Sequence, residues 1–140
     1  MASKIGKKQL EDLAGAALFM RKRSYAPFSK WTVGAALLAK DGTVYTGCNI
    51  ENSAFSPTCC AERTAFFKAI SEGCTDFKAI VIAGGEEGKD PEDFCAPCGV
   101  CRQVMQEFCD PETFEIILVK SQKEYVRYTL KEMLPLGFNL

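Results

Sequence analysis

Two short stretches of the chain combine residue types that can bind a metal ion and move protons. In the first, C-A-E, Cys60 precedes Glu62 by two residues, and in the second, P-C-G-V-C, Cys98 precedes Cys101 by three. A structural zinc site normally takes four protein ligands, whereas a catalytic one takes three and leaves a position for water. We therefore expect Cys60, Cys98 and Cys101 to form a three-thiolate zinc site. Glu62 is the expected acid–base residue beside the metal and is not a ligand.

Both stretches are expected at the start of a helix. Apolar residues at helical spacing predict a helix from about residue 60 to 72, which Gly73 ends. Pro97 has no N–H group and suits the start of a second helix, over about residues 98–108. The free N–H groups and the positive dipole end of a helix N-terminus favour thiolate over thiol. The two predicted helices therefore place the sulfur atoms and favour their ionised form.

The rest of the chain predicts an α/β protein with a single domain, residues 1–140. Asp41-Gly42 between two apolar runs indicates a hairpin, and Thr129 with Glu132 reads as a capping box. Residues 84–93 are rich in glycine and acidic side chains, so we expect a mobile loop there. The predicted elements are helices at 5–22 and from 129, and strands at 32–38, 44–48, 79–82, 115–119 and 125–129. This order indicates a mixed sheet covered by helices on both faces.

The overall charge argues against partners that carry phosphate backbones. The 140 residues have a net charge of -1 and a pI near 5.6, and 47% of them are hydrophobic. We expect no nucleic-acid partner, because such binding needs a basic face. The start of the chain lacks the apolar run of a signal peptide, and no stretch is long enough to span a membrane. The expected location is the cytoplasm, with no membrane partner.

The sequence contains no histidine and eight cysteines. The lack of histidine excludes Ser-His-Asp and Cys-His catalysis, H-E-x-x-H metalloproteases and zinc sites with imidazole ligands. Disulfide bonds are a weak interpretation of the cysteines, because no secretory signal is evident and the apolar residues suffice for a core. Cys48, Cys74 and Cys109 have no matching spacing and are expected to be small buried residues.

Two questions stay open at the expected metal site. Cys95 or Cys59 could supply a fourth ligand and close the site, and Glu62 favours hydrolysis without deciding between the two. Three thiolates on one dication also leave a net negative centre. Arg63, three residues after Cys60, is placed to donate a hydrogen bond to a sulfur atom, although a surface position fits its spacing equally well.

A cysteine and a glutamate two residues later, followed by P-C-x-x-C, form the pattern of zinc deaminases. The chain resembles the cytidine deaminases of the small, homotetrameric, all-cysteine zinc class. Five segments carry this resemblance over most of the chain, in order and at the family's spacing: F-S-K-W-T-V-G-A-A-L from Phe28, G-C-N-I-E-N from Gly47, C-A-E-R-T-A from Cys60, P-C-G-V-C-R-Q from Pro97 and L-P-L-G-F from Leu134.

The resemblance implies a three-layer α-β-α sandwich with a five-stranded mixed sheet. It implies hydrolytic deamination of cytidine and deoxycytidine to uridine and deoxyuridine with release of ammonia, as a step of pyrimidine salvage. Cys60, Cys98 and Cys101 would hold one Zn2+ ion per chain, and Glu62 would carry protons. A homotetramer with shared active sites is implied by the resemblance alone.

The resemblance also assigns polar contacts with the substrate. Asn49 and Glu51 would bind the ribose hydroxyl groups, although their local pattern alone favours a solvated turn. Ala61 would contact the base through its backbone. Contacts to a 3′-hydroxyl group, which both sugars carry, would not distinguish ribose from deoxyribose.

Three aromatic residues complete the implied substrate site, and two of them depart from the family pattern. Trp31 stands where a phenylalanine usually faces the pyrimidine ring, and Phe138 matches a C-terminal aromatic residue that closes over the base. Phe55 lacks the hydroxyl group of the tyrosine that is common there, in a segment that reaches a neighbouring subunit's site. Ala96 is a third departure, because serine often precedes the Pro-Cys pair. These changes bear on substrate preference and do not touch the zinc ligands.

Three other functions compete with deamination of free cytidine and deoxycytidine. A deaminase of bases in nucleic acid usually shows a basic binding surface, which the pI near 5.6 argues against. A blasticidin-type deaminase shares the all-cysteine site but fits residues 49–52 and 62–65 less well. A non-catalytic zinc protein with a closed four-cysteine site is the alternative from another class.

Overall fold

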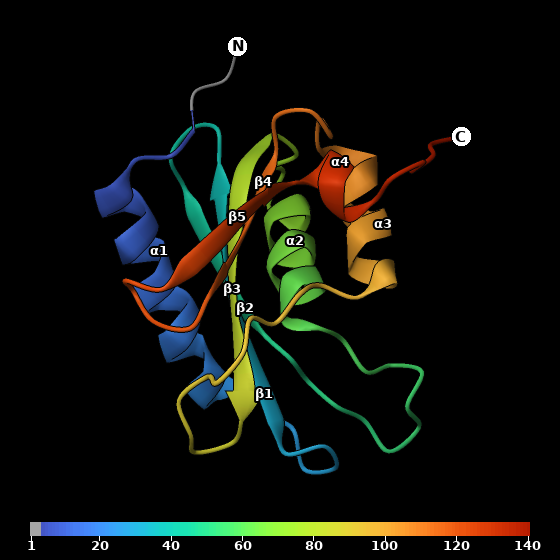
Figure 1. The fold of residues 1–140 in the computed structure, drawn as a ribbon. Helices are drawn as coiled ribbons and strands as arrows, with labels where there is room; N and C mark the ends of the chain where they lie inside the picture. Colours follow the sequence, from blue (N-terminus) through green and yellow to red (C-terminus); the bar gives the residue numbers. More distant parts are fainter. Residues whose placement is uncertain (1–3) are drawn as a thin grey trace.

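A mixed sheet of five strands forms the centre of the structure, a computed structural model that describes residues 4–140 (Figure 1). The strands are β1 (Trp31–Ala39), β2 (Val44–Cys48), β3 (Phe77–Glu86), β4 (Glu115–Val119) and β5 (Tyr125–Thr129). Their order in the sheet is β2-β1-β3-β4-β5, with β3 and β4 parallel and the other neighbours antiparallel. The expected five-stranded mixed sheet is confirmed.

Helices cover both faces of this sheet (Figure 1). One face carries α1 (Lys7–Met20), which continues into the short 3-10 helix η1 (Arg21–Arg23). The other face carries α2 (Ala61–Ser71) and α3 (Gly99–Phe108), and α4 (Leu130–Met133) follows β5 beside α3. The three layers are those expected, and α4 begins with the predicted capping box. Across residues 4–140, we find no helix with the length and apolar character to cross a membrane.

The central strands are apolar on both faces, which is why both faces need helices. On β1, Ala36 and Leu38 pack on the α1 side, whereas Leu37 between them packs on the α2 and α3 side. On β3, Val81 faces α1 and Ile82 faces the other layer. Side chains alternate along a strand with a period of two, so a strand covered on both faces reads as a continuous apolar run.

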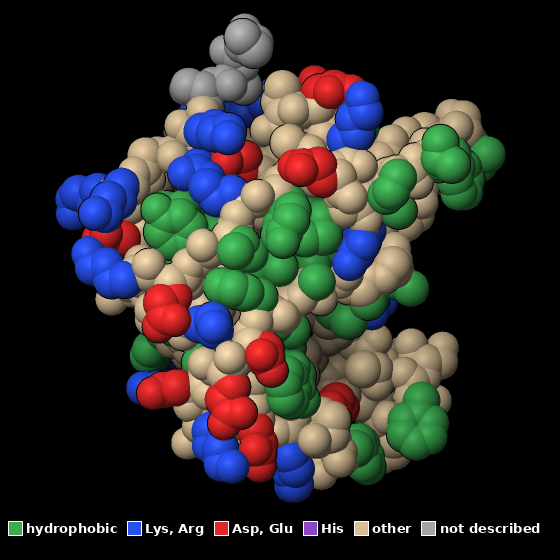
Figure 2. Space-filling model, in the orientation of Figure 1, with side chains coloured by type: hydrophobic (Ala, Val, Ile, Leu, Met, Phe, Trp, Pro, Cys, Tyr) green, Lys and Arg blue, Asp and Glu red, His purple; other side chains and the backbone are tan. Residues whose placement is uncertain are grey.

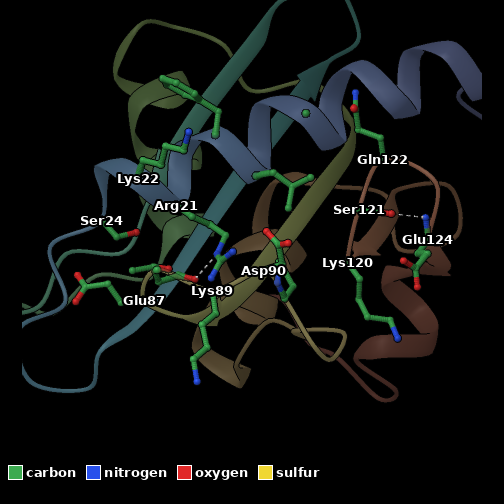
Figure 3. A pocket seen from close by; sticks show the side chains of 16 residues that line it. Arg21, Lys22, Ser24, Glu87, Lys89, Asp90, Lys120, Ser121, Gln122 and Glu124 are labelled. Atoms are coloured by element: carbon green, nitrogen blue, oxygen red, sulfur yellow. Dashed lines mark hydrogen bonds between the residues drawn. The ribbon is translucent and has the colours of Figure 1, made fainter.

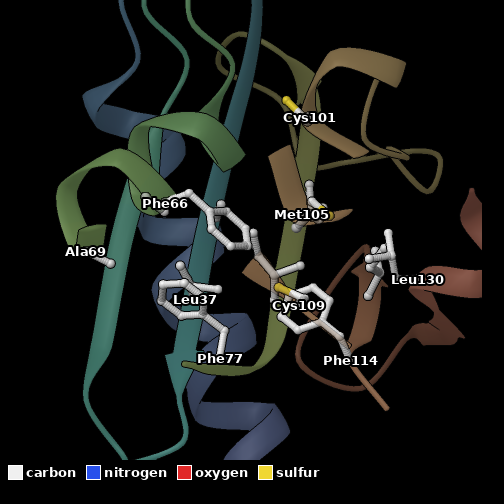
Figure 4. Close-up of a cluster of buried hydrophobic side chains, with 14 of the residues drawn as sticks. Leu37, Phe66, Ala69, Phe77, Cys101, Met105, Cys109, Phe114 and Leu130 are labelled. Carbon is white, nitrogen blue, oxygen red and sulfur yellow. The ribbon is translucent and has the colours of Figure 1, made fainter. Parts of the chain in front are cut away.

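The core between the sheet and α2 and α3 reaches one of the expected zinc ligands. Phe66 of α2 is fully buried in this core and meets Phe77 edge-on, with ring centroids 4.9 Å apart. Met105 of α3 lies near them, and Cys101 lies at the end of the same cluster (Figure 4). Burying a side chain such as Phe66 stabilises a fold by about 1.5–3 kcal/mol. The packing that stabilises α3 therefore also holds Cys101 in place.

A glycine of β2 lets the first turn of α2 approach the sheet closely. A Cβ atom on Gly47 would lie 2.3 Å from the carbonyl oxygen of Ala61 and 2.6 Å from the amide nitrogen of Ala65. Both distances are far below van der Waals contact, so any side chain at Gly47 would push α2 outward. Gly47 thus sets the position of the helix start that carries Cys60 and Glu62.

One sequence-based prediction is wrong at its boundary. Residues 84–93 were expected to form a loop, but β3 continues to Glu86 and pairs with β1, where Trp31 lies opposite Glu86. The missing side chain at Gly84 leaves room for Cys95, whose Sγ would lie 2.6 Å from a Cβ atom there. Glycine is therefore used here for close packing on a strand rather than for a turn.

An ion pair between the buried Glu115 and the partly buried Arg127 ties the amino-terminal segment to β4 and β5. Arg127 donates from Nε to Oε1 and from Nη2 to Oε2 of Glu115, each at 2.9 Å. The N–H group of Ile5 donates to Glu115 Oε2 at 3.1 Å, and the carbonyl oxygen of Ile5 accepts from Arg127 at 2.9 Å. Removing one partner of a buried pair typically costs about 3–5 kcal/mol. Both backbone groups of Ile5 are thus bound by one pair of side chains.

Candidate metal centre and active site

Three cysteine sulfur atoms meet where α2 and α3 begin. Cys60 is the N-cap residue of α2, Cys98 is the N-cap residue of α3, and Cys101 lies in the first turn of α3. All three Sγ atoms lie within 4.8 Å of one another. Neither N-cap side chain is used to cap its helix, so the thiols remain free to bind a ligand. The expected cluster of Cys60, Cys98 and Cys101 is therefore present.

The spacing of these sulfur atoms fits a zinc ion. Two sulfurs bound at about 2.3 Å with a tetrahedral angle between them lie about 3.8 Å apart. The Sγ atoms of Cys60 and Cys98 are 3.8 Å apart. Thiolate is also a ligand that zinc prefers. The residues present thus suit zinc, which Cys60, Cys98 and Cys101 would hold.

The two sulfur atoms considered as a fourth ligand lie outside the cluster. Cys59 accepts a hydrogen bond from the hydroxyl group of Thr64 at 3.7 Å. Cys95 packs against Gly84 of β3, and burial raises the pKa of its thiol. Of the two arrangements left open by the sequence, the structure favours a centre with three sulfur ligands.

Hydrogen bonds favour ionisation of one thiol in the cluster. Those from Cys101, Arg63 and Cys98 lower the pKa of the Cys60 thiol to about 5, although its partial burial acts in the opposite direction. The contact with Cys60 raises the pKa of Cys101, as burial also does. Nη2 of Arg63 lies 3.4 Å from Cys60 Sγ, which is the contact that the sequence left open. Arg63 thus places positive charge beside the sulfur whose pKa is lowered.

Glu62 is buried next to the cluster and lines the same cavity. Its side chain is 4% exposed, and burial, together with the negative charge of Cys60, raises its pKa to about 7. A general acid–base residue works best when its pKa lies near the working pH. The first turn of α2 therefore holds a carboxyl group that can both accept and give up a proton at neutral pH.

A cavity of about 310 Å³ opens in front of the sulfur atoms and Glu62. Four of the residues expected to bind substrate, Trp31, Asn49, Glu51 and Ala61, line it together with Cys60, Glu62 and Cys98. The remaining lining residues are Ser29, Val33, Thr58, Cys59, Cys95 and Ala96. The cavity therefore joins two of the three expected metal ligands, Cys60 and Cys98, to residues expected to bind the sugar and the base.

The side chain of Asn49 is anchored to the start of β1. Its Oδ1 atom accepts from the N–H group of Val33, and its Nδ2 atom donates to the carbonyl oxygen of Trp31, both at 2.8 Å. One N–H bond of the amide group remains for a ligand. Local pattern alone suggests a solvated turn, but the side chain of Asn49 is in fact fixed by hydrogen bonds to the backbone of β1.

Glu51 is bound by the turn that precedes β1. Its Oε1 atom accepts from the N–H groups of Phe28 at 2.9 Å and Ser29 at 3.2 Å, and its Oε2 atom accepts from the Ser29 hydroxyl group. The hydroxyl group of Ser29 is the largest contribution to a lowered pKa of Glu51. Sequence reasoning missed Ser29, because nothing in its own neighbourhood indicates a carboxylate partner from another segment.

Two expected substrate residues lie away from this cavity. Phe55, on the loop before α2, is 73% exposed and meets Phe28 edge-on with centroids 6.2 Å apart. Phe138 is 64% exposed, and its carbonyl oxygen accepts from Gln103 of α3 at 3.1 Å. Phe138 therefore does not close over the cavity of its own chain in this structure. Phe55 was expected to serve a neighbouring subunit, and its exposure leaves it free to do so.

A larger cavity, of about 720 Å³, lies beside α1 (Figure 3). Charged and polar side chains line it, among them Lys22, Lys89 and Asp90. Arg21 uses its guanidinium group there to bind the carbonyl oxygens of Thr32 and Glu86, each at 3.1 Å. None of the three clustered cysteines lines this larger cavity, so size does not identify the reactive site.

Fold and site together define a class of protein. A buried carboxyl group beside three zinc-suited thiolates, in a cavity of small-molecule size, is the arrangement of a metal-dependent hydrolytic deaminase. Residues 7–116 match the family model described as the cytidine and deoxycytidylate deaminase zinc-binding region. The chain therefore belongs to the cytidine and deoxycytidylate deaminase family.

Individual relatives agree with this assignment. A cytidine deaminase from Sporosarcina psychrophila is 46% identical over 130 residues, which cover 93% of this chain and 91% of that protein. The crystal structure of a cytidine deaminase from Burkholderia pseudomallei superposes with a TM-score of 0.81 at 40% identity, covering 91% of this chain and 97% of the other. A blasticidin-S deaminase from Bacillus cereus is less similar, at 31% identity over 79% of each chain.

Proposed function

We propose that the protein converts cytidine and deoxycytidine to uridine and deoxyuridine with release of ammonia, using one zinc ion per chain. The observation that carries this proposal is the single cavity shared by the sulfur cluster, the buried Glu62 and the polar pair Asn49 and Glu51. Membership of the deaminase family and the named activity of the relatives support it. A role in pyrimidine salvage in the cytoplasm follows from the same proposal.

Glu62 is the proposed carrier of protons. It accepts a proton from the attacking water and delivers it to N3 of the pyrimidine ring, which makes C4 more electrophilic. Once the hydroxyl group has added to C4, Glu62 takes the remaining proton of that hydroxyl group and transfers it to the amino group. The C4–N bond then breaks, ammonia leaves, and the C4 oxygen becomes the carbonyl oxygen of uridine. Bound zinc would supply a Lewis acid that lowers the pKa of a water molecule to about 7. The raised pKa of Glu62 suits both directions of proton transfer.

Hydrogen-bond capacity at the other end of the cavity supports binding of a sugar hydroxyl group. A carboxylate offers about four lone-pair sites, and protein donors use three of those on Glu51. One acceptor site on Glu51 and one N–H bond of Asn49 remain. A hydroxyl group can accept from Asn49 and donate to Glu51 at once, so the pair suits a single hydroxyl group. Because one hydroxyl group suffices for this contact, both cytidine and deoxycytidine are expected substrates.

The base is proposed to lie between these two ends. Trp31 lines the cavity and is 43% exposed, so its ring is available to a pyrimidine. Ala61 is fully buried at the start of α2, beside Glu62, and lines the same cavity, so we propose that its backbone contacts the base. Stacking on an aromatic side chain contributes about 1–3 kcal/mol per base in proteins that bind single-stranded nucleic acid.

A homotetramer with shared active sites remains part of the proposal. In the view of Figure 2, the surface is hollowed between two projections that carry apolar side chains, and these correspond in Figure 1 to the loop before α2 and the C-terminal tail. Phe55 and Phe138 lie on these segments and are largely exposed. Aromatic side chains exposed in this way are typical of surfaces that meet another chain.

The test combines metal analysis with an assay of turnover. The purified protein should contain one zinc ion per chain and should produce the ultraviolet change that accompanies conversion of cytidine to uridine. Glu62→Gln should keep the metal and lose about 10²–10⁴-fold in kcat, which is the usual contribution of general acid–base catalysis. The matched control is Glu107→Gln on the exposed face of α3, which should retain full activity. Parent-level turnover by Glu62→Gln would refute the assigned role.

The remaining alternatives predict different outcomes in the same assay. Blasticidin S would be deaminated in preference to cytidine if the blasticidin-type function held. Cys95→Ser should leave zinc bound under the three-sulfur proposal, whereas a closed four-cysteine site would lose it. On the face shown in Figure 2, basic and acidic side chains are intermixed, which does not favour a nucleic-acid substrate.

A further inference from the structure

The hydroxyl group of Ser29 joins two parts of the cavity wall. It donates to Oε2 of Glu51, and it accepts from the backbone N–H group of Trp31 at 3.0 Å. The N–H group of Ser29 donates to the other carboxylate oxygen of Glu51 at 3.2 Å. One serine thus contacts both carboxylate oxygens of Glu51 and the backbone of the aromatic residue.

The backbone around Ser29 is shaped for this role. Lys30 has a φ of 58°, a left-handed conformation that reverses the chain between Ser29 and Trp31. The N–H group of Lys30 donates to the carbonyl oxygen of Ala26 at 3.0 Å, and its carbonyl oxygen accepts from Glu87 at 2.7 Å. Because the turn is bound at both sides, the Ser29 hydroxyl group has a defined position from which to hold a carboxylate.

The other side of Glu51 is held by its own backbone. Its N–H group donates to the carbonyl oxygen of Tyr25 at 2.8 Å. With the main chain fixed, the orientation of the carboxylate depends on the bonds that its oxygens make. The Ser29 hydroxyl group is the one side-chain donor to this carboxylate among residues 4–140. Two backbone N–H groups hold Oε1 and the Ser29 hydroxyl group holds Oε2, which leaves one lone pair of Oε2 for a ligand.

We propose that Ser29 is a positioning residue for substrate: it orients the carboxylate that binds the sugar and fixes it relative to the aromatic wall of the base site. This inference rests on the proposed function, since it concerns how a nucleoside is bound. Ser29 acts through Glu51 and takes no part in the chemical step.

The test measures nucleoside binding, which does not depend on turnover. Deoxyuridine, the product nucleoside, and 2′,3′-dideoxyuridine, which lacks the 3′-hydroxyl group, are titrated into the zinc-loaded protein by calorimetry. Ser29→Ala should weaken deoxyuridine binding about fivefold, because a hydrogen bond to a charged group is lost at an exposed position. Binding of the dideoxy compound should change less than twofold. Ser29→Thr, which keeps the hydroxyl group, should restore most of the loss.

A double-mutant cycle separates positioning from general damage. In a Glu51→Gln background, Ser29→Ala should have little further effect, because both substitutions remove the same interaction. In steady-state assays, Ser29→Ala should raise KM with kcat nearly unchanged. Ser121→Ala is the control, since this serine accepts two backbone bonds in the β4–β5 turn away from the cavity.

Three results would overturn the inference. These are unchanged deoxyuridine binding in Ser29→Ala, an equal loss for the dideoxy compound, and a full additional loss in the Glu51→Gln background. Failure of the proposed function is distinguishable from all three results. A parent protein that binds deoxyuridine but does not convert cytidine contradicts the proposed reaction, while the binding measurements still test the role of Ser29. A parent protein that binds neither nucleoside contradicts both proposals.

Discussion

At the scale of single residues, two ionisable groups in one helical turn are shifted in opposite directions. Hydrogen bonds lower the pKa of Cys60, whereas burial raises that of Glu62 two residues later. A thiolate is therefore available to bind a cation, while the neighbouring carboxyl group keeps its proton until near neutrality. The contrast arises because Glu62 is almost fully buried, whereas the sulfur of Cys60 is only partly buried and receives several hydrogen bonds.

The shift at Glu62 predicts how the stability of the metal-free protein depends on pH. The folded pKa is raised to about 7 from an ordinary value of 4.5. The stabilising contribution of Glu62 is therefore fully present below pH 4.5 and is lost as pH rises through 7, on the order of 3 kcal/mol in total. Glu62→Gln cannot ionise and should lack this dependence.

Urea unfolding of the chelator-treated parent and Glu62→Gln proteins between pH 5 and pH 8 checks this prediction. The parent should lose stability relative to the variant as pH rises, and the difference should level off above neutrality. The cysteines titrate in both proteins, so the difference between the two reports the ionisation of Glu62 together with its coupling to Cys60 and Cys101. A difference that stays constant over this range would contradict the assigned burial.

At the scale of secondary-structure elements, two helix N-termini converge on one small volume. Cys60 and Cys98 occupy N-cap positions with extended backbone and no capping hydrogen bond from the side chain. The sulfurs thus lie at the positive ends of both helix dipoles, which offset part of the charge of a three-thiolate centre. The contact with Gly47 sets the position of α2 and therefore also sets where the sulfur of Cys60 lies relative to the other two.

Gly47→Ala should disturb the metal centre through α2. The added Cβ atom would overlap the backbone of Ala61 and Ala65, so the start of the helix must move. We expect a loss of about 1–3 kcal/mol of stability, the usual cost of overpacking, together with weaker zinc binding. Gly6→Ala is the control, because a Cβ atom there meets nothing within 4 Å. Unaltered zinc affinity, measured by competition with a chelating dye, would contradict this role of Gly47.

Prediction from sequence succeeded where local pattern determines the element. Strands 115–119 and 125–129 were predicted with the bounds that the structure has, because their apolar and alternating runs are uninterrupted. The local sequence around Gly84 predicts a loop, whereas its place in β3 depends on pairing with β1 and on packing of Cys95, neither of which local pattern reveals. Ser29 was missed for the same reason, since its partner Glu51 is 22 residues away.

At the scale of the whole molecule, the sulfur cluster connects segments that are far apart in the sequence. Cys60 and Cys98 are 38 residues apart, and their helices pack into the same core on one face of the sheet. A bound ion would therefore join α2 to α3 in the folded chain alone. Ligands that bind the folded state stabilise it according to their affinity and free concentration.

Zinc removal should consequently lower the melting temperature. At a free zinc concentration 1,000-fold above its Kd, the stabilisation is about 4 kcal/mol, which corresponds to roughly 10 °C or more for a chain of this size. Calorimetry before and after chelation measures the change, and zinc added back should reverse it. The Cys98→Ser variant should show a smaller response. An unchanged melting temperature after complete loss of zinc would contradict a ligand role for the cluster.

The tie between Ile5 and the Glu115–Arg127 pair has a consequence for how the amino end can vary. Extra residues placed before Lys4 need not disturb the tie, because it begins at the N–H group of Ile5. Trimming past Ile5 would instead expose a carboxylate and a guanidinium group that have lost their backbone partners. Changes of length before Ile5 are thus expected to leave the fold stable, whereas removal of Ile5 itself is expected to destabilise it.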